Sequence, residues 1–108
     1  MYLSNIETIP GTSIVTSHGI VSGSSVRAKH VGRDLMASVK NVFGGELKGY
    51  TELLSESRDQ ALSRMKEEAT ALGANGIVNI RFSTSSVTAG ASEIYVYGTA
   101  VTVKRSLP

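Results

Sequence analysis

The side chains that could hold a metal ion or act as a general base are few in this chain. It has two histidines, His18 and His30, and no cysteine, which excludes disulfides, thiolate metal sites and a cysteine nucleophile. A zinc or copper site needs three or four converging His, Cys or carboxylate ligands. His30 and Asp34 lie one helical turn apart, a spacing that more often gives a hydrogen bond than a shared ion. The sequence predicts no metal site, with His18, His30 and Asp34 as weak candidates.

No catalytic arrangement follows from the other polar residues. Serines are abundant, but the G-x-S-x-G nucleophile elbow is absent. The segment 19–23, GIVSG, lacks the Lys-Ser/Thr pair that follows the glycines of a phosphate-binding loop. We therefore expect no enzyme activity, no catalytic residues and no cofactor. An oligomeric structural or interaction module is the favoured function, and the alternatives are a small-ligand or metal-ion binder at subunit interfaces and an undetected enzyme.

Three cations share one side of a predicted first helix. At about 100° per residue, Lys29, Arg33 and Lys40 fall within roughly 40° of one another. The commoner explanation is a solvated helix back. The other is weak, salt-sensitive binding of an anion or an acidic partner, with Arg33 as the main anchor because its guanidinium can hold a phosphate or carboxylate through two hydrogen bonds.

Length and composition indicate a single domain over residues 1–108. Hydrophobic residues make up 41% and charged residues 19% of the chain, which is enough for a core and is not typical of disorder. The net charge of +2 is too small to indicate a nucleic acid partner. No apolar run approaches the roughly 20 residues that span a bilayer, and the N-terminus lacks the pattern of a signal peptide. We expect a soluble cytoplasmic protein.

The segment from Tyr50 to Phe82 defines the architecture. Apolar or small residues recur there at steps of three and four, which predicts an amphipathic helix. Gly73 is placed to end that helix in the left-handed conformation. Residues 77–82 follow as a strand, with Val78, Ile80 and Phe82 on one predicted face.

The flanking segments supply the remaining predicted elements. We expect a strand over 13–22, a break at 23–25, a first helix over 27–43 and a last strand over 93–104, with a brief strand near residues 3–7. The order β-α-α-β-β predicts an α+β fold, a small antiparallel-rich sheet with two helices on one face.

The last strand is apolar on both faces. Alternate residues give two apolar sets, one of Ile94, Val96, Gly98 and Ala100 and one of Tyr95, Tyr97, Val101 and Val103. Strand-forming residues can produce such a pattern by propensity alone. However, an antiparallel sheet with one face in water should alternate apolar and polar residues. We therefore predict that another copy of the chain covers the second face or an open edge.

Short motifs along the whole chain resemble those of the YbjQ-like family, small bacterial and archaeal proteins labelled "putative heavy-metal-binding". The resemblance runs nearly end to end, through IPG at 9–11, GIVSG at 19–23, RD at 33–34, GGE at 44–46, YT at 50–51, RDQAL at 58–62, LGANGIV at 72–78, RF at 81–82 and YGTAV at 97–101. It implies a dodecin-like subunit in a ring-shaped homo-oligomer of five copies, with no established activity. Family members commonly have a cysteine near the place that His18 holds here.

Overall fold

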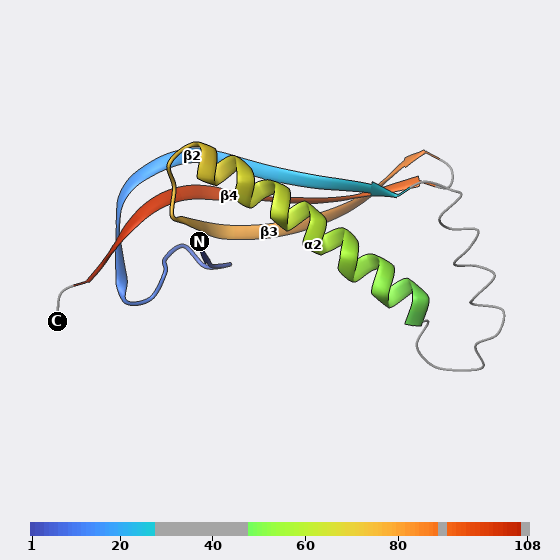
Figure 1. Ribbon diagram of the computed structural model, residues 1–108, viewed down its shortest axis with the longest axis horizontal. Helices are drawn as coiled ribbons and strands as arrows, with labels where there is room; N and C mark the ends of the chain where they lie inside the picture. Colours follow the sequence, from blue (N-terminus) through green and yellow to red (C-terminus); the bar gives the residue numbers. More distant parts are fainter. Residues whose placement is uncertain (28–47, 89–90, 107–108) are drawn as a thin grey trace.

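The computed structural model describes residues 1–27, 48–88 and 91–106. Its elements pack as one helix against one curved sheet (Figure 1). In chain order they are β1 (Tyr2–Leu3), β2 (Thr12–Arg27), α2 (Lys48–Ala71), β3 (Gly76–Thr88) and β4 (Ala91–Arg105).

Helix α2 ends as its sequence predicts. Gly73 has φ +87°, a left-handed conformation that only glycine adopts without strain. The amide of Gly73 donates to the Thr70 carbonyl at 3.0 Å, and the amide of Ala74 donates to the Ala69 carbonyl at 3.1 Å. These two bonds form a Schellman motif, which satisfies carbonyls that the last helical turn leaves free.

The sheet has four strands in the order β1-β3-β4-β2. Strands β2 and β3 both pair with β4 in antiparallel fashion, so β2 and β3 run in the same direction. The short β1 joins the far edge of β3 in parallel, with Tyr2 beside Gly76 and Leu3 beside Ile77. The long strand β2 forms the other edge of the sheet.

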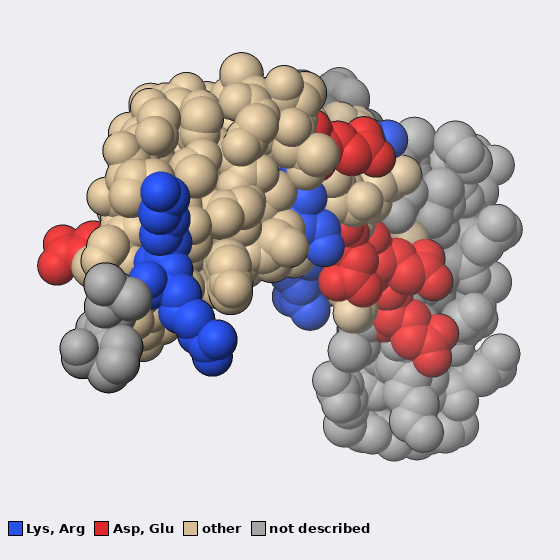
Figure 2. Space-filling model, turned by 60° about the vertical axis from the view of Figure 1, so that its left-hand side comes forward, with Lys and Arg blue, Asp and Glu red and all other residues tan. Residues whose placement is uncertain are grey.

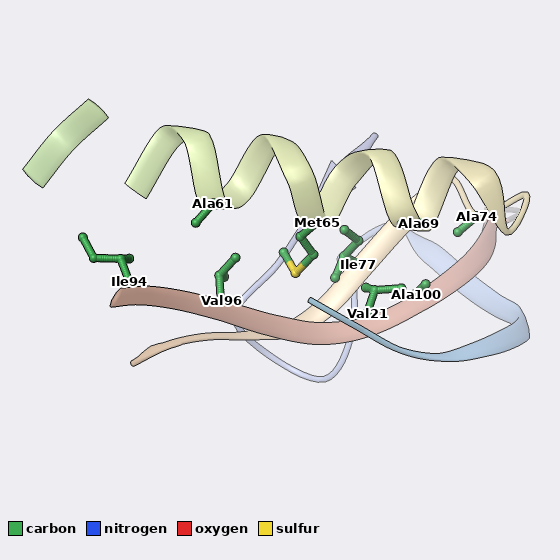
Figure 3. Close-up of a cluster of buried hydrophobic side chains, with 9 residues drawn as sticks. All are labelled: Val21, Ala61, Met65, Ala69, Ala74, Ile77, Ile94, Val96 and Ala100. Atoms are coloured by element: carbon green, nitrogen blue, oxygen red, sulfur yellow. The ribbon is translucent and has the colours of Figure 1, made fainter. Parts of the chain in front are cut away.

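The main core lies between α2 and the sheet (Figure 3). The helix packs chiefly on β2 and next on β4, and it contributes Ala61, Met65 and Ala69, each 0% exposed. The sheet contributes Val21, Ile77, Ile94, Val96 and Ala100. Helix and sheet approach closely at Gly23, where a Cβ would lie 2.6 Å from the backbone nitrogen of Met65.

A second, smaller core lies on the opposite side of the sheet. There Ile9 of the N-terminal segment is buried against Val78, Val101 and Val103. The segment is held by backbone bonds, including those from the amide of Asn79 to the Ile6 carbonyl and from the amide of Ile80 to the Ser4 carbonyl. The sequence predicted that another copy would cover the second face of the sheet. Part of that face is instead covered by the chain's own N-terminal segment.

The predicted arrangement of two helices on one face of an antiparallel-rich sheet is wrong. In the described part of the chain the order is β-β-α-β-β, with a single helix and a mixed sheet. The predicted first helix lies outside the described residues, except for Arg27, which ends β2. The predicted break at 23–25 is also wrong, because β2 continues through it. The small residues predicted to break the strand instead serve its packing against α2. The Oγ of Ser25 donates to the Gln60 side chain at 2.7 Å, and the missing side chain of Gly23 leaves space for the helix backbone.

Strand β3 departs from the predicted alternation. It continues to Thr88, so the serine and threonine tract after Phe82 is strand. A bulge between Val78 and Arg81 shifts the register, and Asn79 in the bulge has φ 54°. Val78 and Phe82 therefore lie on opposite faces: Val78 is 3% exposed, whereas Phe82 is 46% exposed.

Candidate functional site

His18 is the candidate metal ligand that the structure describes. It lies at a register shift of β2 between Ser17 and Gly19, and its side chain is half-buried. Its Nε2 lies 2.7 Å from the hydroxyl oxygen of Thr102, which in turn lies 3.5 Å from the carbonyl of Gly73. His18 thus fastens the edge strand to β4 near the end of α2, which gives the imidazole a structural role.

The other site residues of the sequence prediction lie outside the described residues. They are Lys29, Arg33 and Lys40 of the cationic stripe, and His30 and Asp34 of the weak metal pair. Anion binding by the stripe therefore stays a prediction. Within residues 1–27, 48–88 and 91–106, no group of three or more His, Cys, Asp or Glu side chains is placed to hold a metal ion.

The second face, meaning the sheet face away from α2, leaves large apolar side chains uncovered beside the small core of Ile9. Pairing with β4 places Ile14 beside Val103, Ile20 beside Thr99, and Val26 beside Glu93. We call Ile14, Ile20, Val26 and Tyr97 the uncovered strip. Their exposed fractions are 42%, 78%, 53% and 40%. An apolar side chain as exposed as Ile20 in the middle of a strand indicates a contact surface when its neighbours are exposed too.

Two tyrosines extend this surface onto the middle strand. The rings of Tyr95 and Tyr97 are stacked, with centroids 5.7 Å apart and planes 29° apart. Ser22 and Ser24 of β2 flank them on one side, and Arg81 and Ser83 of β3 flank them on the other. The second face therefore carries a tyrosine pair on β4 and aliphatic side chains on β2 that are separated by serines.

The outer edge of β2 is only partly protected. The Arg64 guanidinium of α2 donates to the carbonyl of Ser24 at 2.6 Å, which occupies one backbone group near the end of the strand. Register shifts at Ile14/Thr16 and Ser17/Gly19 distort the opposite end. Between them, Gly19–Gly23 is regular, and no described residue pairs with its outer side.

Charged side chains of both signs lie at both ends of the view in Figure 2, with a broad surface free of Lys, Arg, Asp and Glu between them. On the second face itself, Arg81 lies beside Tyr97 and Glu93 beside Val26. Among the described helical residues, none forms a helix long and apolar enough to cross a membrane.

Sequence reasoning identified the doubly apolar last strand but missed the residues that shape the edges of the sheet. Neither Arg64 nor Arg81 was singled out by its position in the sequence. In the structure Arg81 donates to the carbonyl of Asn5 at 2.5 Å and holds the N-terminal segment against β3. Asn75 bonds both backbone groups of Val103, at 2.8 and 3.0 Å. No spacing in the sequence signals these contacts, because each joins elements distant along the chain.

Comparison with known proteins finds a matching family model and close relatives. The model of the YbjQ family, described as "Putative heavy-metal-binding", matches residues 1–104. A UPF0145 protein of Hahella chejuensis is 61% identical over 104 residues, covering 96% of this chain and all of that protein. A UPF0145 protein of Halorubrum lacusprofundi is 54% identical with the same coverage.

A solved structure supports the fold. It is a protein of unknown function of the DUF74 family from Pediococcus pentosaceus, with a TM-score of 0.64 and 17% identity, covering 96% of this chain and 98% of that one. At that identity the likeness extends to the fold alone. By the family match and the close relatives, the chain belongs to the YbjQ family of UPF0145 proteins.

Proposed function

We propose that this protein is the subunit of a closed homo-oligomer and acts as a structural or interaction module rather than as an enzyme. The observation that carries the proposal is the uncovered strip on the second face, with Ile20 at its centre and 78% exposed. Large apolar side chains exposed on an edge strand are typical of surfaces that another chain covers.

The partial cover of the sheet supports the same proposal. In the described part of the chain, α2 packs on one face of the sheet, and the small core of Ile9 covers only part of the other face. Five copies, the number that the resemblance implies, is the size we propose.

The test is the mass of the assembly in solution. Light scattering coupled to size-exclusion chromatography should give a closed oligomer for the native chain at micromolar concentration. Ile20→Asp adds a charge to an exposed position, so the subunit should still fold but should no longer assemble. Thr70→Asp, which adds the same charge on the exposed side of α2, should leave the assembly intact. A monomeric native chain would refute the proposal.

Metal or small-ligand binding between subunits is the second candidate, favoured by the position of His18 on the edge strand. The described residues of one chain do not fit a heavy-metal site, because His18 is the single histidine among them and no carboxylate cluster surrounds it. Such a site would need ligands from other copies or from residues outside the described ranges.

We therefore expect elemental analysis of gently purified protein to find no stoichiometric zinc, copper or iron. The assembled oligomer, not the isolated subunit, is the sample to measure. One metal ion per subunit, lost in His18→Ala but kept in Ser17→Ala, would favour the binding function over the purely structural one.

A further inference from the structure

We propose that the Asn75-Gly76 pair is a site of spontaneous deamidation, which the fold keeps unreactive and which reacts once β3 separates from its neighbours. The inference goes beyond the proposed assembly and does not depend on it. It starts from the sequence, whose four asparagines are at positions 5, 41, 75 and 79. Asn75 precedes a glycine, whereas each of the others precedes an isoleucine or a valine.

The reaction at this pair consumes water and needs no other partner. The backbone nitrogen of Gly76 attacks the side-chain carbon Cγ of Asn75. The new N–C bond closes a succinimide ring, the bond from Cγ to Nδ2 breaks, and the proton of the Gly76 amide passes through water to the ammonia that leaves. Water then opens either C–N bond of the ring and gives aspartate or isoaspartate at position 75. A glycine nitrogen has no neighbouring Cβ to obstruct the attack, whereas isoleucine and valine are branched there.

The folded chain holds both reacting groups in place. Nδ2 of Asn75 donates to the carbonyl of Val103 at 3.0 Å, and the amide of Val103 donates to Oδ1 of Asn75 at 2.8 Å. Gly76 is buried at the start of β3, between Tyr2 of β1 and Val101 of β4. Ring closure makes Cγ tetrahedral and expels Nδ2, so it cannot finish while both side-chain atoms keep their bonds to Val103.

The backbone of Asn75 is fixed as firmly as its side chain. Its amide donates to the carbonyl of Val101 at 3.1 Å, and its carbonyl accepts from the amide of Tyr2 at 2.9 Å. The residue is nevertheless exposed to water, so hydrogen bonding rather than burial supplies the protection. The rate of deamidation in the folded protein is therefore set by the fraction of chains in which β1, β3 and β4 are apart at this point.

The product no longer fits the position. A carboxylate only accepts hydrogen bonds, so aspartate keeps the bond from the Val103 amide but loses the donor to the Val103 carbonyl. It also places a charged oxygen against that carbonyl, which disfavours the folded state. Isoaspartate lengthens the main chain just before Gly76 and disturbs the register of β3 with both neighbours. Each prolonged opening thus leaves a permanent mark that makes the next opening easier.

Peptide mapping by mass spectrometry tests the site in the native chain. Trypsin releases residues 67–81 as one peptide, which contains both Asn75 and Asn79, so Asn79 serves as an internal control. After incubation in urea at mildly alkaline pH, Asn75 should appear as a mixture of aspartate and isoaspartate, with Asn79 unchanged. In the same buffer without urea, the reaction at Asn75 should be at least about tenfold slower, which corresponds to an opening free energy of about 1.4 kcal/mol.

Two pairs of proteins test the route and the consequence. In urea, Gly76→Ala should deamidate at Asn75 more slowly than the native chain. The Cβ that it adds lies 2.8 Å from Cδ1 of Ile9 in the fold, but that clash has no effect on an unfolded chain. In the folded protein, Asn75→Asp should lower the urea midpoint. Asn79→Asp, the same change four residues away at an exposed position, should lower it less.

Each part of the inference has an outcome that overturns it. An unmodified Asn75 in urea, or an equal rate in Gly76→Ala, would show that the pair is not such a site. Equal rates with and without urea would show that the fold does not protect it. Equal midpoints for Asn75→Asp and Asn79→Asp would show that the product is tolerated. None of these measurements depends on the mass of the assembly, so they leave the proposed function untouched.

Discussion

Gly23 shows how one residue sets the distance between helix and sheet. Its missing side chain lets α2 approach until a Cβ would lie 2.6 Å from the Met65 nitrogen. The obstructing atoms belong to helix backbone, which cannot rotate away as a side chain can. The pattern alone suggested a strand break, because glycine next to serines marks a turn more often than a close approach.

We therefore predict that Gly23→Ala destabilises the protein. Overpacking of a filled core costs about 1–3 kcal/mol, which exceeds the gain of about 0.4–1 kcal/mol from a less flexible unfolded chain. Urea denaturation should show a lower midpoint for Gly23→Ala. Ser22→Ala, one residue away on the second face, should unfold close to the native chain. Equal midpoints for the two variants would mean that the helix sits farther from β2.

At the scale of elements, the helix was predictable and the strand limits were not. The apolar repeat and Gly73 defined α2 to within a few residues, because both signals are local. The length of β3 depends on its pairing with β4. This pairing extends the strand through a run of serines and threonines whose composition is typical of a loop. The bulge at Asn79 reverses which residues after Val78 face α2. Asparagine adopts a positive φ more readily than most residues, but its presence in a strand does not by itself predict a bulge. The uncovered strip follows from pairing and edge position, so its location could not be predicted either.

The rotation of α2 about its axis, which decides which residues face the sheet, can be tested by substitution. Ala61 is 0% exposed and lies between the helix and β2, as the apolar repeat predicts. Ala61→Asp would bury a carboxylate with no cation in the core cluster, which should cost several kcal/mol. Ser63→Asp, two residues on and exposed, should cost little. Thermal unfolding of the two variants compares them directly, and similar melting would show that the helix is rotated from this position.

At the scale of the whole molecule, the subunit is long and its core is thin. The principal extents are 56 × 27 × 17 Å, and the helix buries mostly alanines and one methionine against the sheet. In Figure 1 the N-terminal end of α2 leaves the sheet, so that end of the helix covers no strand. Small buried side chains contribute less apolar area than leucines or phenylalanines would. An isolated subunit should therefore be only marginally stable, and contacts between copies should supply much of the stability.

This leads to a prediction about concentration. Association with other folded copies stabilises a folded subunit by mass action, so the melting temperature of an assembly rises with protein concentration. For the native chain we expect a rise of several degrees over a hundredfold increase in concentration, measured by circular dichroism or differential scanning fluorimetry. Ile20→Asp should melt lower and show no such dependence, because its assembly is blocked while its own core is unchanged. Thr70→Asp should behave as the native chain does. A native melting temperature independent of concentration and equal to that of Ile20→Asp would mean that each subunit is stable alone, and that the uncovered strip serves some contact other than self-association.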